Sequence, residues 1–178
     1  MKNIVLIGFM GSGKTSVGKK IAESACLKFT DVDAEIEKSS KMKIKDIFAR
    51  RGESYFRALE TAVLKKVAAR SGAVISTGGG IIKMRRNFPI LKKAGVVVYL
   101  KNSFAVSARR LEGKDDRPLF RKDNIKSARE LYKSRLALYK EASDITVVTD
   151  KKNIDQAARL IIKKTENFFG TGKSKIKK

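Results

Sequence analysis

The feature that most constrains this chain is the segment of residues 8–15, GFMGSGKT, which matches G-x-x-x-x-G-K-[ST] at every defined position. A short apolar run precedes it, as expected of a buried strand, and residues 14–25 place Val17, Ile21 and Ala25 on one face of a helix. Glycines allow the backbone to curve so that successive amides and the N-terminus of the next helix face an anion. The motif therefore predicts a phosphate-binding loop between a strand and a helix.

The same segment predicts a nucleoside triphosphate as one ligand. Lys14 can reach the β- and γ-phosphates, and the hydroxyl of Thr15 can bind Mg²⁺. A dinucleotide site is disfavoured because residue 16 is serine where the G-x-G-x-x-G pattern needs glycine or alanine. The alternative to a phosphate-binding loop is a purely structural glycine-rich turn in which the lysine occurs by chance. The strand predicted before the motif and the helix predicted after it disfavour this alternative. The predicted ATP-binding residues of this loop are Gly11, Ser12, Gly13, Lys14, Thr15 and Ser16.

Apolar runs alternate with segments of helical periodicity along the chain, which is the pattern of βαβ units. The predicted strands cover residues 2–7, 28–31, 73–76, 96–100 and 145–148, and the predicted helices cover 14–25, 34–38, 44–51, 53–70, 89–93, 103–111, 125–142 and 153–169. They predict an α/β fold of three layers, with a five-stranded parallel sheet between helices. We expect a single domain over residues 1–169, with a substrate-binding insert at about 32–60, a polar lid at about 112–124 and a basic disordered tail at 170–178.

The composition limits the chemistry that the chain can perform. Its 178 residues include no histidine and a single cysteine, Cys26. A Ser-His-Asp triad, an HExxH zinc site, an intrachain disulfide and a cysteine-clustered metal site are therefore excluded. Carboxylates, lysine, arginine, hydroxyls and backbone amides remain. This set suits phosphoryl transfer, in which the protein mainly positions groups and stabilises charge.

No apolar run is long enough for a membrane helix, and the first residues lack the pattern of a signal peptide, so we expect a cytoplasmic protein without a membrane partner. The formal net charge of +23 is compatible with anionic small ligands. The alternative is a basic nucleic-acid-binding NTPase or a silent binding module. Because lysines are spread over nearly every predicted helix and tryptophan is absent, we disfavour nucleic acid as a partner. We also expect a monomer.

Two further segments follow predicted strands, where open α/β sheets bind ligands. Asp31 and Asp33 end the second strand: one carboxylate could accept the proton of an acceptor hydroxyl and the other could hold magnesium through water. The alternative is that Asp33 simply caps the helix that follows. Gly78, Gly79 and Gly80 follow the third strand and allow close approach of the backbone to a ligand, although a loose connector is the alternative.

Arginine side chains are the third set of candidates, because their planar fork suits carboxylates and phosphates. Arg57 has Glu53 four residues before it and Glu60 three residues after it, so an ordinary ion-pair network on a helix face is a serious alternative. Composition alone does not choose among the candidates, which are Arg57, Arg109, Arg110, Arg117 and Arg135.

Six segments, taken together, resemble the shikimate kinase family. They are GFMGSGKTSVGKKIA (8–22), DVDAEIE (31–37), IFARRGESYFRALE (47–60), STGGG (76–80), RPL (117–119) and YKSRLALY (132–139). The resemblance spans roughly residues 3–168. It implies an ATP-dependent kinase that phosphorylates the 3-hydroxyl of shikimate to shikimate 3-phosphate, in the chorismate pathway to aromatic amino acids, with Mg²⁺ as cofactor. A gluconate kinase would share the phosphate-binding loop, but we do not expect it to carry the other segments together.

The resemblance also implies roles for residues of the acceptor site. Asp33 matches the aspartate that contacts the shikimate hydroxyls and is the candidate base, and Asp31 matches the one linked to magnesium through water. Arg57 and Arg135 match the pair that binds the shikimate carboxylate. Gly79 matches a backbone donor to shikimate, and we include the flanking Gly78 and Gly80 in the predicted acceptor site.

Two more arginines are matched on the ATP side. Arg117 matches the lid arginine that reaches the ATP phosphates, which places it with Lys14 and Asp33 among the predicted catalytic residues. Arg110 matches a residue near the adenine, with the adjacent Arg109 as the alternative register.

Overall fold

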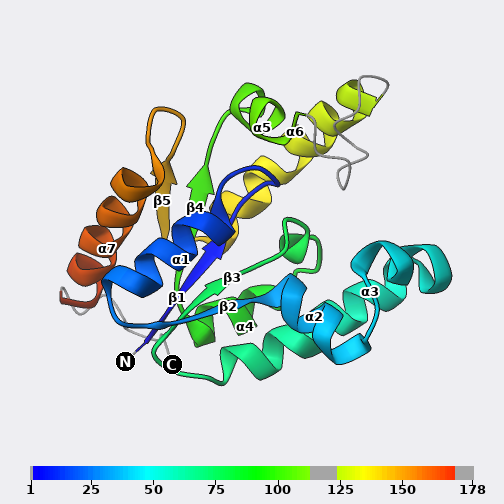
Figure 1. Ribbon diagram of the computed structural model, residues 1–178, viewed down its shortest axis with the longest axis horizontal. Helices are drawn as coiled ribbons and strands as arrows, with labels where there is room; N and C mark the ends of the chain where they lie inside the picture. Colours follow the sequence, from blue (N-terminus) through cyan, green and yellow to red (C-terminus); the bar gives the residue numbers. More distant parts are fainter. Residues whose placement is uncertain (1, 113–123, 171–178) are drawn as a thin grey trace.

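Five parallel strands form one sheet in a computed structural model that describes residues 2–112 and 124–170. The strand order is β2-β3-β1-β4-β5 (Figure 1). Their bounds are Asn3–Ile7 (β1), Lys28–Asp31 (β2), Ala73–Ser76 (β3), Gly95–Lys101 (β4) and Ile145–Val148 (β5). The predicted strands are confirmed, and no bound differs from the predicted one by more than one residue.

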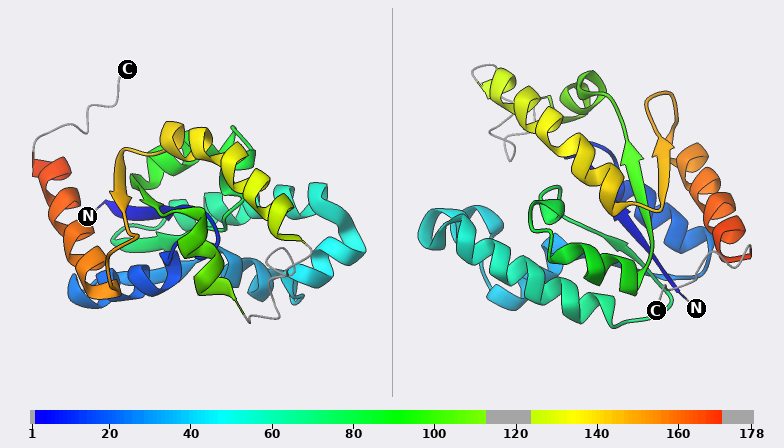
Figure 2. Two further views of the ribbon diagram at one scale, coloured as in Figure 1. Left: turned by 90° about the horizontal axis from the view of Figure 1, so that it is seen from above. Right: turned by 180° about the vertical axis from the view of Figure 1, so that it is seen from behind.

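Helices cover both faces of this sheet. They are α1 (Lys14–Ser24), α2 (Val32–Ser40), α3 (Ile44–Ala68), α4 (Asn87–Ala94), α5 (Phe104–Leu111), α6 (Ile125–Ala142) and α7 (Ile154–Gly170), with a 3₁₀ turn at Ile81–Lys83 (η1). Helices α1 and α7 pack together on one face, and α3, α4 and α6 lie on the other (Figures 1 and 2). The predicted three-layer α/β fold is therefore confirmed. Within the described ranges, no helix is long and apolar enough to cross a membrane.

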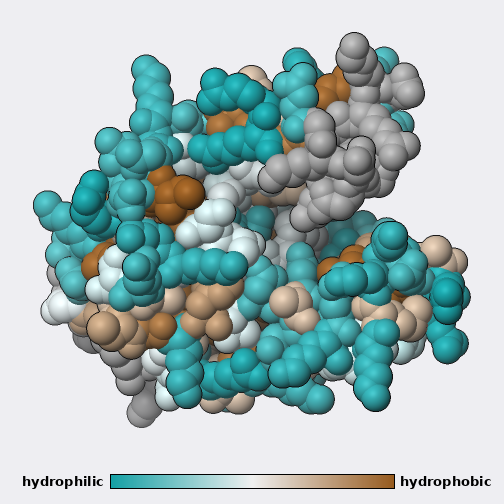
Figure 3. All heavy atoms as spheres, in the orientation of Figure 1, coloured by the Kyte–Doolittle hydropathy of each residue, from teal (hydrophilic) through white to brown (hydrophobic). Residues whose placement is uncertain are grey.

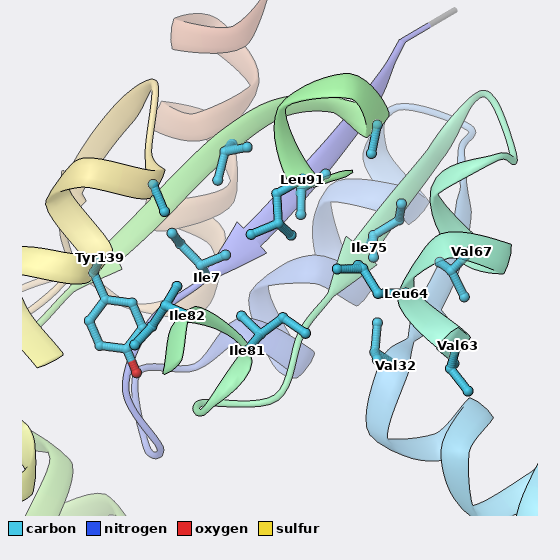
Figure 4. Close-up of a cluster of buried hydrophobic side chains, with 14 of the residues drawn as sticks. Ile7, Val32, Val63, Leu64, Val67, Ile75, Ile81, Ile82, Leu91 and Tyr139 are labelled. Carbon is cyan, nitrogen blue, oxygen red and sulfur yellow. The ribbon is translucent and has the colours of Figure 1, made fainter. Parts of the chain in front are cut away.

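Alternation along β1 shows why the two helical layers are needed. Val5 and Ile7 belong to the apolar cluster beneath α3, α4 and α6, whereas Ile4 and Leu6 belong to the cluster beneath α1 and α7. All four side chains are buried. Figure 4 shows Ile7 in the first cluster with residues from β3, α3, α4 and α6 around it. Because β1 is apolar on both faces, helices must pack on both faces of the sheet at this strand. Burial on both faces is typical of a central strand in a parallel sheet.

Helix α3 is interrupted at Gly52, whose φ of 77° and ψ of 173° are not helical. A Cβ atom there would meet nothing within 4 Å, so the backbone conformation rather than crowding requires glycine. The predicted division into a helix that stops at this glycine and a second helix after it is confirmed. The second piece carries Arg57 and the buried Glu60.

The topology predicts a ligand-binding crevice at the carboxyl ends of β1 and β3. From β1 the chain passes through α1 to β2 at one edge of the sheet, and from β3 it passes through α4 to β4 on the other side of β1. Neighbouring strands whose connections diverge in this way form the ligand-binding crevice of open α/β sheets. The glycine-rich loop at residues 8–15 and the glycines at 78–80 follow these two strands. Nearly all of the predicted lid, and the tail beyond Gly170, lie outside the described residues and remain predictions.

Candidate active site

The glycine-rich loop joins β1 to α1, as predicted. Gly13 is the N-cap of α1 with a left-handed φ of 92°, and no side chain caps the helix there. The amides of its first turn are therefore not satisfied by a cap side chain, and they carry the positive end of the helix dipole. Ser12 is buried, and its Oγ has no hydrogen-bond partner among the described residues. These features suit an anion such as a phosphate group.

Lys14 points back into this loop. Its side chain is buried, and Nζ donates hydrogen bonds to the carbonyl oxygens of Gly8 at 2.9 Å and Phe9 at 3.1 Å. The ammonium group is thus held within the curve of the loop by its backbone. This position places a positive charge where the motif predicts that phosphates bind.

Thr15 and Asp31, the two predicted magnesium ligands, lie side by side. The Thr15 hydroxyl donates to Oδ2 of Asp31 at 2.9 Å and lies 3.5 Å from the hydroxyl of Ser76. Three oxygen atoms beside a phosphate-binding loop are the donors that Mg²⁺ prefers when it keeps several waters and binds phosphates. In the described part of the chain, no cluster of three or more acidic, histidine or cysteine side chains offers an all-protein metal cage.

Asp31, and not Asp33, caps helix α2. Oδ1 of Asp31 accepts hydrogen bonds from the backbone N–H groups of Asp33 at 3.0 Å and Ala34 at 3.4 Å. The alternative in which Asp33 serves only as a helix cap is therefore wrong. The side chain of Asp33 lies instead against the triple glycine, since a Cβ atom at Gly78 would lie 2.6 Å from its Oδ1. No side chain fits at Gly78 while Asp33 holds this position.

Arg57 lies against the same triple glycine at Gly80. Nε donates to Glu53 at 3.1 Å and Nη1 donates to Glu60 at 2.7 Å. The ion-pair network that the helix spacing suggested is thus present. The guanidinium group also packs on Gly80, because a Cβ atom there would lie 2.5 Å from both terminal nitrogens. The two interpretations of Arg57 are compatible, since the glutamates hold the guanidinium at the turn.

Glu60, which the sequence predicts only as an ion-pair partner, lies beside the predicted site residues Arg57 and Asp33. It is fully buried, and its Oε1 has no hydrogen-bond partner among the described residues. Burial raises the pKa of this carboxyl, and the nearby charge of Asp33 adds to the effect, while Arg57 and Arg135 oppose it. Glu60 lies four residues from the buried Phe56 and from the buried Leu64 on α3. A glutamate within the apolar stripe of a helix is the sequence pattern that could have predicted this buried carboxylate.

Arg135 reaches the triple glycine from α6. Its Nη1 donates to the carbonyl oxygen of Gly79 at 3.2 Å, and its guanidinium lies 5.9 Å from the ring centroid of Phe9. The Nε–H group is buried without a hydrogen-bond partner among the described residues. A buried guanidinium donor without a partner is costly unless a ligand supplies the acceptor. Arg135 therefore suits an anionic group bound beside the turn.

The triple glycine also connects the arginines to the phosphate-binding loop. A Cβ atom at Gly79 would lie 3.4 Å from the backbone nitrogen of Met10, so the two loops lie close together. The carbonyl groups of the three glycines accept hydrogen bonds from within the protein. By contrast, their three N–H groups make no hydrogen bond with any described residue. The turn thus presents backbone donors beside two arginines.

The remaining predicted residues lie on the ATP side or outside the described ranges. Arg110 donates from Nη1 to the carbonyl of Gly11 at 3.2 Å and from Nη2 to that of Thr149 at 3.4 Å, between the glycine-rich loop and the loop after β5. Arg109 and Ser16 are exposed. Arg117 lies outside the described residues. The space-filling view shows a hollow between the lobe of α2 and α3 and the rest of this face (Figure 3).

Comparison of this chain with known proteins identifies one family. A family model described as shikimate kinase matches residues 10–166. A shikimate kinase of Sulfurihydrogenibium is 44% identical over 164 residues, which cover 92% of this chain and 98% of the relative. That of Persephonella marina is 42% identical over 162 residues, which cover 91% and 98%.

Solved structures agree with these sequences. Shikimate kinase from Acinetobacter baumannii in complex with shikimate has a TM-score of 0.86 and 35% identity, and the match covers 99% of this chain and 96% of that one. A gluconokinase from Sinorhizobium meliloti has a TM-score of 0.55 and only 22% identity, covering 96% and 97%, so it shares the fold alone. With matches of this identity and coverage, the chain belongs to the shikimate kinase family.

Proposed function

We propose that this chain transfers the γ-phosphoryl group of ATP to the 3-hydroxyl of shikimate, producing ADP and shikimate 3-phosphate in the pathway to aromatic amino acids. The observation that carries the proposal is the position of the triple glycine. Gly79 lies close to the phosphate-binding loop at Met10, and its carbonyl accepts a hydrogen bond from Arg135. A triphosphate in the loop and a carboxylate on the arginines would therefore meet at this turn.

On the ATP side, the amides from Gly11 to Ser16 and the ammonium of Lys14 bind the phosphates. Thr15 and Asp31 would hold Mg²⁺, and their adjacent oxygen atoms support this assignment. When bound, the ion neutralises charge on the phosphate oxygens. Lys14 stabilises the negative charge of the transferred group.

On the acceptor side, Arg57 and Arg135 bind the carboxylate of shikimate, and the amides of residues 78–80 donate to its polar groups. This fixes the 3-hydroxyl beside Asp33, whose carboxylate accepts the hydroxyl proton as the oxygen attacks phosphorus. The new bond joins that oxygen to phosphorus, and the bond to the leaving ADP oxygen breaks. Positioning supplies much of the rate, because the two reactants are held in line.

Several expectations belong to this proposal as predictions. They are the contact of Arg117 with the ATP phosphates, the closure of a lid at about residues 112–124, a single domain over residues 1–169, a monomer, a cytoplasmic location and no nucleic-acid partner.

A coupled assay of ADP release tests the proposal. Shikimate should stimulate ADP release in the presence of Mg²⁺, whereas gluconate, a nucleoside monophosphate and RNA should not. The product should be identified as shikimate 3-phosphate. A preference for gluconate or for a nucleoside monophosphate would show that the acceptor assignment is wrong.

A further inference from the structure

Tyr139, on α6, contacts the acceptor turn without belonging to the residues assigned to substrates above. Its hydroxyl donates to the carbonyl oxygen of Gly79 at 2.5 Å. The same oxygen accepts from Nη1 of Arg135 at 3.2 Å. One carbonyl therefore joins the glycine turn to two side chains one turn apart on α6.

The surroundings of Tyr139 hold its ring in one place. The side chain is fully buried, and the ring stacks on Tyr99 with centroids 5.0 Å apart and an interplanar angle of 20°. Figure 4 shows the ring beside Ile82, with the hydroxyl oxygen at the edge of the apolar cluster. Burial raises the pKa of the Tyr139 hydroxyl well above its ordinary range, so the group stays protonated and remains a donor.

This hydrogen bond determines more than the position of one oxygen. A peptide group is planar, so fixing the Gly79 carbonyl also fixes the direction of the Gly80 N–H on the opposite side of the same peptide. The Gly78 carbonyl accepts from the N–H of Ile81 at 3.2 Å, and this fixes the Gly79 N–H in the same way. Three adjacent glycines have few backbone restraints of their own. The turn therefore depends on such bonds for a single conformation.

We propose that Tyr139 is a positioning residue for the acceptor substrate, which fixes the Gly79–Gly80 peptide and the guanidinium of Arg135 through the Gly79 carbonyl. The inference rests on the proposed function, because it takes shikimate as the acceptor. Tyr139 touches no reacting atom. Its contribution is to hold the backbone donors of the turn and the carboxylate-binding arginine in register with each other.

The test compares two tyrosine-to-phenylalanine variants on the same helix. Tyr139→Phe removes the hydroxyl and keeps the stacked ring. Tyr132→Phe is the matched control, because the Tyr132 hydroxyl donates to a backbone carbonyl, that of Asn102, at 2.7 Å and away from the glycine turn. We expect Tyr139→Phe to raise the KM for shikimate about three- to tenfold, the range expected for one lost hydrogen bond, with the KM for ATP unchanged. Tyr132→Phe should leave the KM for shikimate unchanged.

Two further readouts separate positioning from general loosening. Thermal unfolding should show similar stability losses in the two variants, and calorimetric titration of shikimate without ATP should show weaker binding only for Tyr139→Phe. An unchanged KM for shikimate in Tyr139→Phe, or an equal rise in both variants, overturns the inference. An inactive wild-type chain would instead contradict the proposed function, so the two failures are distinguishable.

Discussion

The hydroxyl of Thr15 donates a hydrogen bond to Oδ2 of Asp31 over 2.9 Å, although 16 positions separate the two residues in the sequence. Thr15 is in the first turn of α1, and Asp31 is the last residue of β2. The parallel sheet brings the two residues together because β1, which precedes the loop that leads to Thr15, and β2 have their carboxyl ends at the same edge of the sheet. Asp31 uses its other oxygen to cap α2. One carboxylate thus serves both the proposed metal site and the start of a helix.

The double use of Asp31 allows its two roles to be separated in one variant. Asparagine is as good a helix cap as aspartate, but it lacks the charge that attracts a cation. Asp31→Asn should therefore leave the melting temperature unchanged and raise the Mg²⁺ concentration needed for half-maximal activity by about tenfold or more. A magnesium titration at saturating ATP and shikimate measures this effect. An unchanged requirement for Mg²⁺ would mean that Asp31 is a helix cap only.

Lys14→Ala tests the charge inside the phosphate-binding loop. The ammonium is held by two backbone carbonyls of the loop and faces the proposed phosphate site. We expect kcat to fall by about 10²- to 10³-fold, as for removal of one transition-state donor, with little loss of folding stability. The exposed Lys19 on the same helix provides the control, and Lys19→Ala should keep full activity. If Lys14→Ala retains activity, the proposed role of Lys14 in stabilising the transferred phosphoryl group is wrong.

Local patterns predict much of this fold, because each element depends on neighbouring residues. The strands are short apolar runs, and the loop at residues 8–15 needs only its own glycines, lysine and threonine. The break in α3 also follows from one residue, since Gly52 adopts a left-handed φ that other residues avoid. The family resemblance added pairs such as Arg57 and Arg135, which no local pattern joins.

The remaining contacts of the site depend on tertiary packing. The acceptor of the Tyr139 hydroxyl is a carbonyl 60 positions away, and no periodicity in α6 identifies it. From the sequence alone, either Asp31 or Asp33 could cap α2. In the structure Asp31 is the cap, because the helix begins directly after β2. Glu60 becomes a site residue because α3 packs its apolar stripe against the sheet.

Arg57 forms an ion pair with Glu60 and is proposed to bind shikimate, and two variants can separate these roles. Its side chain is 11% exposed and its ion-pair partner Glu60 only 1%, so Arg57→Ala leaves a buried carboxylate without its partner. We expect a loss of about 3–5 kcal/mol in the free energy of unfolding. We also expect the KM for shikimate to rise by about tenfold or more, because a charged hydrogen bond to the substrate is lost, with the KM for ATP nearly unchanged.

The double variant Arg57→Ala, Glu60→Gln removes the unpaired charge. It should recover most of the stability while the KM for shikimate stays high. Denaturant unfolding and steady-state kinetics on the same samples provide both readouts. If stability and KM recover together in the double variant, Arg57 acts only through the ion-pair network on its helix.

The buried carboxyl of Glu60 should also leave a signature in the pH dependence of stability. Its pKa in the folded chain is raised above the ordinary 4.5, chiefly by burial. As pH rises from about 4.5 toward the raised pKa, the unfolded chain loses this proton first. The native state then binds more protons than the unfolded state, so this group lowers stability as pH rises through the window.

Glu60→Gln is the reference for this measurement because it cannot titrate. The glutamates whose pKa values are lowered, Glu37 and Glu53, are present in both chains, so their effects on stability, which have the opposite sign, largely cancel in the comparison. The free energy of unfolding of the wild type, minus that of Glu60→Gln, should fall with rising pH above about 4.5 and become constant once Glu60 is ionised in both states. Urea unfolding across this pH range measures the difference. If the difference rises with pH, the charge of Arg57 outweighs burial at Glu60.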